Sequence, residues 1–159
     1  MKRNFIALCA LFSNEAFQTE ADGKPVGIYT LRAGDVTMQV TNYGARVVSL
    51  WTPDRAGDYE DIVLGYETID RYINNDGERF LGAVVGPYAN RIAKGSFTLD
   101  GTEYNLPINN NGQTLHGGID GLDRVVWDVV SASEDQLVMK YLHADGQEGF
   151  PGNLQIEMT

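Results

Sequence analysis

Residues 35–41 read DVTMQVT, and this stretch decides the fold class. Its apolar side chains are Val36, Met38 and Val40, and they alternate with polar residues. Successive side chains of a strand point to opposite faces of a sheet. The alternation therefore predicts a half-buried β-strand with these three residues on one face.

Similar runs lie on both sides of this stretch, at residues 27–32, 45–51, 61–64, 96–99, 102–106, 125–131, 136–142 and 154–158. An Asp-Gly pair at residues 100–101 separates two of these runs, which is a strong hairpin signal. Only residues 67–74 favour a helix, of about two turns. Many short strands joined by hairpins, with hardly any helix, predict an all-β antiparallel fold, either a sandwich or a barrel.

The composition narrows the possible functions. The chain has 159 residues, 43% of them hydrophobic, which is enough for the core of one domain. Its net charge of −10 disfavours nucleic acid and an anionic membrane surface as partners, but not a neutral sugar. With 1 Cys and 2 His, an intrachain disulfide is excluded and a structural zinc site is not expected.

The first sixteen residues contain a basic start and an apolar run at residues 5–12, which is too short to span a bilayer. The run resembles the core of a signal peptide, although Asn14 stands where a cleavable region needs a small residue. Two interpretations of residues 1–16 stay open. They form an N-terminal extension of a cytoplasmic protein, or they are a signal segment of an exported, periplasmic one.

Two polar segments are candidates for a functional site. Residues 86–92 read GPYANRI, where Asn90 and Arg91 offer an amide and a planar guanidinium that together can hold vicinal hydroxyls. Residues 109–118 read NNNGQTLHGG, where His116 stands beside glycines that permit close approach of a ligand. The structural alternatives stay open at this point: an ion pair for Arg91, a turn cap for Asn90 and a polar loop holding His116.

Seven segments, taken together and in order, resemble the aldose 1-epimerase family, also called the galactose mutarotases. They read TNYGAR (41–46), PDRAG (53–57), DIVLGY (61–66), GPYANRI (86–92), FTLDG (97–101), LHGG (115–118) and DGQEGFPGNL (145–154). The resemblance covers residues 17–159, which are therefore expected to form the N-terminal part of a mutarotase-like β-sandwich domain.

The resemblance implies a fold, an activity and a site. The fold is the large antiparallel β-sandwich of the galactose mutarotases, called a supersandwich. The activity is interconversion of the α and β anomers of aldoses such as galactose and glucose, with no cofactor and no metal. Asn90, Arg91 and His116 fall on the family's sugar-binding positions, and His116 is expected to support charge near the ring oxygen.

The resemblance also implies missing parts. The family's general acid is a histidine in a segment of the form Asn-His-x-Tyr-Phe-Asn, and its general base is a late glutamate. Neither segment occurs in these 159 residues. The chain thus resembles the N-terminal half of a mutarotase. We expect an incomplete sandwich that is inactive alone, has its acid and base beyond Thr159, and self-associates through exposed edge strands.

Two other functions stay open. A non-catalytic β-sandwich carbohydrate-binding module would use the same Asn90, Arg91 and His116 without needing an acid and a base. An epimerase-like protein acting on a sugar phosphate would need extra basic residues around its pocket, which the net charge of −10 does not favour.

Overall fold

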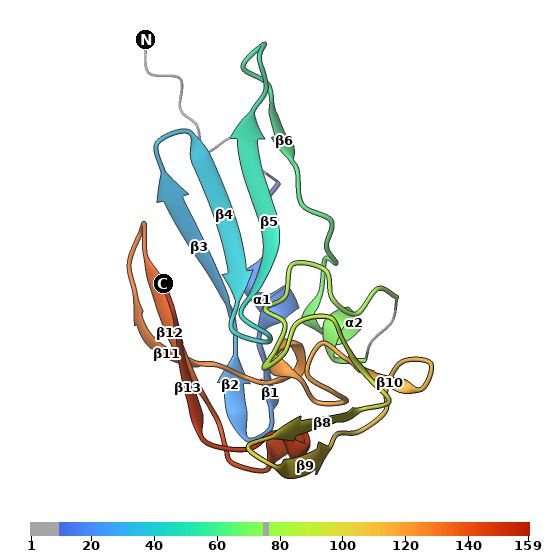
Figure 1. Ribbon diagram of the computed structural model, residues 1–159. Coiled ribbons are helices and arrows are strands. Elements are labelled where there is room, and N and C mark those ends of the chain that lie inside the picture. The colour runs from blue at the N-terminus through green and yellow to red at the C-terminus, as the bar shows by residue number, and fades with distance from the viewer. Residues whose placement is uncertain (1–9, 75–76) are drawn as a thin grey trace.

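A computed structural model describes residues 10–74 and 77–159, and most of its elements are strands (Figure 1). The strands are β1 (Thr19–Ala21), β2 (Lys24–Val26), β3 (Ile28–Ala33), β4 (Val36–Thr41), β5 (Arg46–Pro53), β6 (Tyr59–Asp61), β7 (Arg91–Ala93), β8 (Ser96–Leu99), β9 (Thr102–Asn105), β10 (Gln113–Leu115), β11 (Asp128–Ala132), β12 (Leu137–His143) and β13 (Leu154–Met158). The helices are α1 (Asn14–Phe17) and α2 (Ile69–Ile73), with single 3₁₀ turns at Leu122–Arg124 and Gln147–Gly149. The paired strands run antiparallel, which confirms the expected all-β antiparallel fold.

The strands form two larger sheets and three small ladders. One sheet has the order β3-β4-β5-β6 and the other the order β11-β12-β13, while β1–β2, β7–β10 and β8–β9 pair by themselves. In Figure 1 the four-stranded sheet stands at the top, the three-stranded sheet lies below it, and β8–β9 is at the bottom. The predicted Asp-Gly hairpin joins β8 to β9, with φ of 49° at Asp100 and 80° at Gly101. Two positive φ values at such a pair match the right-handed twist of the flanking strands.

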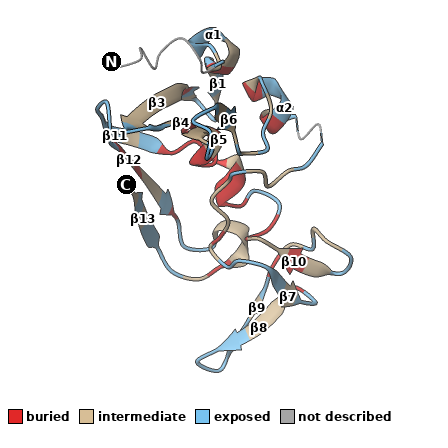
Figure 2. Cartoon of the chain, turned by 90° about the horizontal axis from the view of Figure 1, so that it is seen from above, coloured by how far each residue is buried: buried red, intermediate tan, exposed pale blue. Residues whose placement is uncertain are grey.

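The two larger sheets are joined by a hydrophobic core. Its buried residues are Val40, Ala45, Leu122, Val125, Trp127, Leu137 and Met139. Trp127 is 0% exposed, and its indole N–H donates to the carbonyl oxygen of Leu122 at 3.2 Å, so the ring is buried with its polar group satisfied. Figure 2 shows the buried segments gathered at the centre, while the β8–β9 hairpin projects away from them. The result is a β-sandwich with this buried cluster between its two larger sheets.

Strand β4 is more buried than its alternation predicts. Gln39 and Thr41, on the polar face, are only 1% and 0% exposed. The segment before α1 covers this face: the N–H of Phe12 donates to Gln39 Oε1 at 2.9 Å, and Gln39 Nε2 donates to the Phe12 carbonyl at 3.0 Å. The expectation of a half-buried strand is therefore wrong for the C-terminal end of β4. A side-chain amide that pairs with backbone in this way is buried without an unsatisfied group.

The strand expected at residues 61–64 lies earlier, at β6, which ends at Asp61. The carboxylate of Asp61 explains the end, because its Oδ1 accepts from the N–H of Leu50 at 2.9 Å and from the N–H of Val63 at 3.1 Å. An Asp side chain that binds the N–H two residues later forms a turn in place of a ladder. Ile62 and Leu64 are consequently exposed, by 62% and 79%.

The segment in which a signal peptide or extension was expected is described only in part. Residues 1–9, and with them Cys9 and most of the apolar run, lie outside the described residues. Phe12 and Ala16 pack against a second core cluster, which contains Phe17, Val48 and Tyr72 among its buried residues. Within residues 10–74 and 77–159, no helix is long and apolar enough to cross a membrane.

Candidate functional site

The two polar segments of the sequence meet through the β7–β10 ladder. Leu115 of β10 pairs with Arg91 of β7, so the next residues outward, His116 and Asn90, lie opposite each other. The His116 N–H donates to the Asn90 carbonyl at 3.0 Å. Arg91 is therefore the first residue of strand β7, and its position beside Asn90 and His116 is fixed by backbone pairing.

Backbone conformation turns both residues out of the ladder. Asn90 has a φ of 69° and His116 a φ of 52°, in the left-handed region that Asn and His tolerate better than most residues. Gly117 follows with a φ of 92°, and a Cβ there would collide with the carbonyl oxygen of Gly86. The turn after His116 thus requires glycine, both for its φ and for its close approach to the neighbouring segment.

Side-chain hydrogen bonds link the three candidate residues. The N–H of Asn90 donates to His116 Nδ1 at 3.0 Å. Arg91 donates from Nη1 to Asn90 Oδ1 at 3.3 Å and from Nε to Asn110 Oδ1 at 3.2 Å. Asn90 and Arg91 are exposed, so the remaining donors of the amide and of the guanidinium face solvent and are available to a ligand. The structure brings together every site residue expected from the sequence.

The protonation state of His116 follows from its surroundings. Partial burial lowers its pKa below the ordinary 6.5; the Asp123 charge opposes this shift, while Arg91 and Arg79 add to it. Because Nδ1 accepts a hydrogen bond from Asn90, the neutral ring carries its proton on Nε2. Near neutral pH, His116 is therefore a neutral imidazole whose Nε2–H can donate to a ligand oxygen.

Three further residues stand behind His116, and the sequence interpretation missed them. The ring of Phe80 meets the imidazole edge-on, with 4.6 Å between centroids. The guanidinium of Arg79 lies 4.7 Å from the Phe80 centroid and forms an ion pair with Asp123, at 2.7 Å from Nε to Oδ2. Asp123 is 0% exposed. Residues 121–127 read GLDRVVW, and this mostly apolar run indicates a core segment. A carboxylate in such a segment needs a partner, which was the available signal for Asp123.

A pocket of about 490 Å³ lies beside Arg91. It is lined by Pro87, Tyr88, Arg91, Ile92, Ala93, Phe97 and Phe150. Most of these side chains are apolar or aromatic, which is typical of small-molecule pockets. Arg91 thus borders both this pocket and the Asn90–His116 pair. Among the described residues, no group of three or more His, Cys, Asp or Glu side chains is placed to hold a metal ion.

Comparisons with known proteins agree on one family. The family model described as aldose 1-epimerase matches residues 27–159. A probable aldose 1-epimerase from Arthroderma benhamiae is 41% identical over 143 residues, which are 87% of this chain and 32% of that protein. Galactose mutarotase from Rattus norvegicus is 39% identical over 137 residues, which are 86% of this chain and 39% of that protein.

Solved structures give the same result. An aldose epimerase homologue from C. elegans superposes with a TM-score of 0.77 at 30% identity, covering 83% of this chain and 40% of that chain. A galactose 1-epimerase from Lactobacillus acidophilus superposes with a TM-score of 0.73 at 26% identity, covering 89% of this chain and 41% of that chain. The chain thus spans between 32% and 41% of the length of these relatives.

Proposed function

Since this chain belongs to the aldose 1-epimerase family, we propose that Asn90, Arg91 and His116 form the sugar-holding part of a mutarotase site. One observation carries the proposal: the Asn90 N–H donates to His116 Nδ1, which leaves the proton of the neutral ring on Nε2. An imidazole donor, a guanidinium fork and an amide then present their hydrogen-bonding groups from one ladder end. Such a set suits the vicinal hydroxyls and ring oxygen of an aldose.

The reaction that we propose is mutarotation. A base removes the proton of the anomeric hydroxyl, and an acid protonates the ring oxygen, so that the hemiacetal opens. Rotation about the C1–C2 bond exposes the other face of the carbonyl, and the two proton transfers reverse. In this scheme Asn90 and Arg91 hold hydroxyls, while His116 donates its Nε2 proton in a hydrogen bond near the ring oxygen and stabilises charge there.

The two main proton-transfer groups are proposed to come from the part of the relatives that this chain does not match. The matched part is 39% of rat galactose mutarotase. Each positioned acid or base contributes about 10²- to 10⁴-fold to the rate. We therefore propose that the chain by itself binds an aldose without accelerating its mutarotation measurably.

The proposed substrate is a neutral aldohexose, with galactose and glucose as the first candidates. The net charge of −10 has no electrostatic cost for a neutral ligand, whereas it would repel a phosphate ester. The relatives described as galactose mutarotase support galactose as the first sugar to measure.

Binding is the first test. Saturation-transfer NMR and heteronuclear titration with D-galactose would compare the wild type with Arg91→Ala. The matched control is Arg55→Ala, which removes another exposed arginine, in the turn between β5 and β6. We expect galactose to bind the wild type and Arg55→Ala, and Arg91→Ala to weaken binding about tenfold, the effect of losing a charge-assisted hydrogen bond pair. Equal affinities in the three proteins would contradict the assigned site.

Catalysis needs a second experiment. A chimera would join this chain to the part of rat galactose mutarotase that lies beyond its matched region. In polarimetry of freshly dissolved α-D-galactose, the folded chimera is expected to accelerate mutarotation, and Arg91→Ala in the chimera to slow it. A folded chimera that binds galactose without acceleration would favour the carbohydrate-binding module. Acceleration by the isolated chain would contradict the proposed separation of binding and proton transfer.

A further inference from the structure

A continuous series of contacts leads from the buried Asp123 to the imidazole of His116. Asp123 is 0% exposed, and Arg79 binds it with two hydrogen bonds, Nε to Oδ2 at 2.7 Å and Nη2 to Oδ1 at 3.0 Å. A bidentate pair of this kind fixes the plane of the guanidinium as well as its position. The carboxylate that binds Arg79 is fully buried, and its neighbours in sequence Leu122 and Val125 belong to the core.

The same guanidinium reaches the turn that carries His116. Arg79 Nη2 also donates to the carbonyl oxygen of Gly118 at 3.3 Å, two residues beyond His116. Arg79 therefore contacts this turn through its polar edge. Its Cζ lies over the ring of Phe80, 4.7 Å from the centroid, which is within the range of a cation–π contact.

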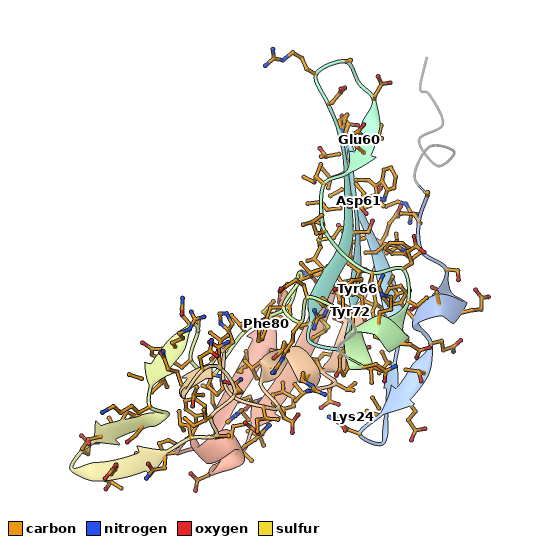
Figure 3. All side chains as sticks on the ribbon, turned by 90° about the vertical axis from the view of Figure 1, so that its right-hand side faces the viewer. Lys24, Glu60, Asp61, Tyr66, Tyr72 and Phe80 are labelled. Atoms are coloured by element: carbon orange, nitrogen blue, oxygen red, sulfur yellow. The ribbon has the colours of Figure 1, made fainter. Side chains whose placement is uncertain are left out.

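The backbone on both sides of Phe80 is held by a second arginine, which is buried. Arg46 is 1% exposed, and its Nη1 donates to the carbonyl oxygens of Arg79 at 2.9 Å and Leu81 at 2.7 Å. These carbonyls flank Phe80, so the ring has little freedom to move with its backbone. Figure 3 labels Phe80 between the upright four-stranded sheet and the β8–β9 hairpin.

The ring that is held in this way is the one that touches the imidazole. Phe80 and His116 are 4.6 Å apart between centroids, with their planes at 62°. Edge-to-face pairs at this distance are favourable beyond the area that they bury. His116 is thus restrained at its ring by Phe80 and at Nδ1 by the N–H of Asn90.

We propose that Arg79 and Phe80 are positioning residues that hold the His116 imidazole with its Nε2–H directed toward the sugar. The sugar-binding part of this proposal rests on the proposed function. The proposal deepens that function by naming residues that contact and restrain His116 without contacting the sugar. Phe80 restrains the ring, Arg79 restrains Phe80 and the Gly118 turn, and the buried Asp123 anchors Arg79. Neither Arg79 nor Phe80 is assigned a direct contact with the sugar.

The test is the state of the His116 ring in two variants. Phe80→Leu removes the edge contact and leaves the Arg79–Asp123 pair intact. Phe12→Leu is the matched control, because it makes the same change in a half-buried ring that packs on Phe17, with 5.7 Å between centroids. Long-range ¹H–¹⁵N NMR reports the tautomer of each imidazole, and the chain has only 2 His to assign.

We expect the wild type and Phe12→Leu to show His116 almost entirely as the Nε2–H tautomer. Phe80→Leu should show a mixture of tautomers and bind galactose about three- to tenfold more weakly, as expected for loss of one aromatic pair. Phe80→Tyr, which keeps the ring, should restore both properties. A merely structural role would change thermal stability without changing the tautomer.

A second variant keeps the test decisive if Phe80→Leu does not fold. Arg79→Met combined with Asp123→Asn removes both charges of the ion pair at similar volume, so neither partner of this pair is left charged without the other. It is expected to shift the His116 tautomer in the same direction. An unchanged tautomer and unchanged galactose affinity in either folded variant would overturn the proposal. If the wild type itself binds no galactose, the proposed function fails, while the tautomer measurements still decide the positioning roles.

Discussion

Arg46, on β5, donates a hydrogen bond of 3.0 Å from Nη2 to the main-chain oxygen of Asp123. Together with its bonds to the carbonyls of Arg79 and Leu81, this makes one guanidinium the partner of three main-chain oxygens from two separate segments, the loop at residues 79–81 and the 3₁₀ turn at Leu122–Arg124. It also lies over the ring of Tyr72, at 4.6 Å from the centroid. The buried Arg46 side chain thus holds in place the two segments that contain Arg79, Phe80 and Asp123, next to the candidate site.

Arg46→Met is therefore expected to be strongly destabilising. The apolar side chain fills a similar volume but leaves three carbonyls without their donor, which costs about 2 to 5 kcal/mol in free energy of unfolding. Urea denaturation would measure the loss. Arg55→Met, at an exposed turn, is the control and should change the free energy of unfolding by no more than about 0.5 kcal/mol. Similar effects of the two variants would mean that the Arg46 hydrogen bonds contribute little.

The turn after His116 offers a second prediction. Gly117→Ala places a side chain at a φ of 92° and against the Gly86 carbonyl oxygen. Gly112→Ala has a similar positive φ of 78°, but no atom lies within 4 Å of the added Cβ. Backbone strain alone costs about 1 to 2 kcal/mol. Gly112→Ala should lose about that much and still bind galactose, whereas Gly117→Ala should lose more and bind it weakly. Thermal melts and the galactose titration would separate the two contributions.

More of the fold than of the surroundings of the candidate site could be predicted from the sequence. Strand-like alternation and the Asp100-Gly101 turn located most strands, because these are local signals. Alternation could not show that residues before α1 cover the polar face of β4, since covering depends on where another segment folds. For this reason Gln39 was expected to face solvent and is 1% exposed.

At the candidate site, too, local sequence patterns could not reveal contacts with residues that are distant along the chain. Asn90, Arg91 and His116 stood out because polar residues beside glycines interrupt the strand pattern. Arg79 and Phe80 did not, because their role depends on Asp123, which is 44 positions from Arg79 along the chain. Self-association through edge strands and the separate status of residues 1–16 stay predictions.

A third prediction concerns stability and pH through His143. This residue is 1% exposed, and burial lowers its pKa below the ordinary 6.5. Between that lowered pKa and 6.5, the unfolded chain binds more protons than the folded one, so stability falls as pH falls through this window. His143→Phe keeps a ring against Phe150, whose centroid lies 6.0 Å from that of the imidazole, and removes the titration. Urea midpoints measured from pH 8 to pH 5 should therefore fall less in this variant; parallel curves would contradict the assignment.

The last prediction applies the same reasoning to His116 and to sugar binding. Its pKa is lowered mainly by burial, so the ring is neutral above 6.5 and gains a proton only below that value. In the neutral ring Nε2 already carries a proton, so the second proton binds at Nδ1, the atom that accepts the hydrogen bond from the Asn90 N–H. Protonation therefore breaks this hydrogen bond and leaves the Nδ1–H and the Asn90 N–H facing each other. Galactose affinity should hence be constant from pH 8 to pH 6.5 and should fall at lower pH, in parallel with the His116 titration followed by NMR. His143→Phe should leave this binding profile unchanged, because His143 is not part of the site. An affinity that rises on acidification would show that the protonated imidazole binds the sugar, and would reverse the role assigned to His116.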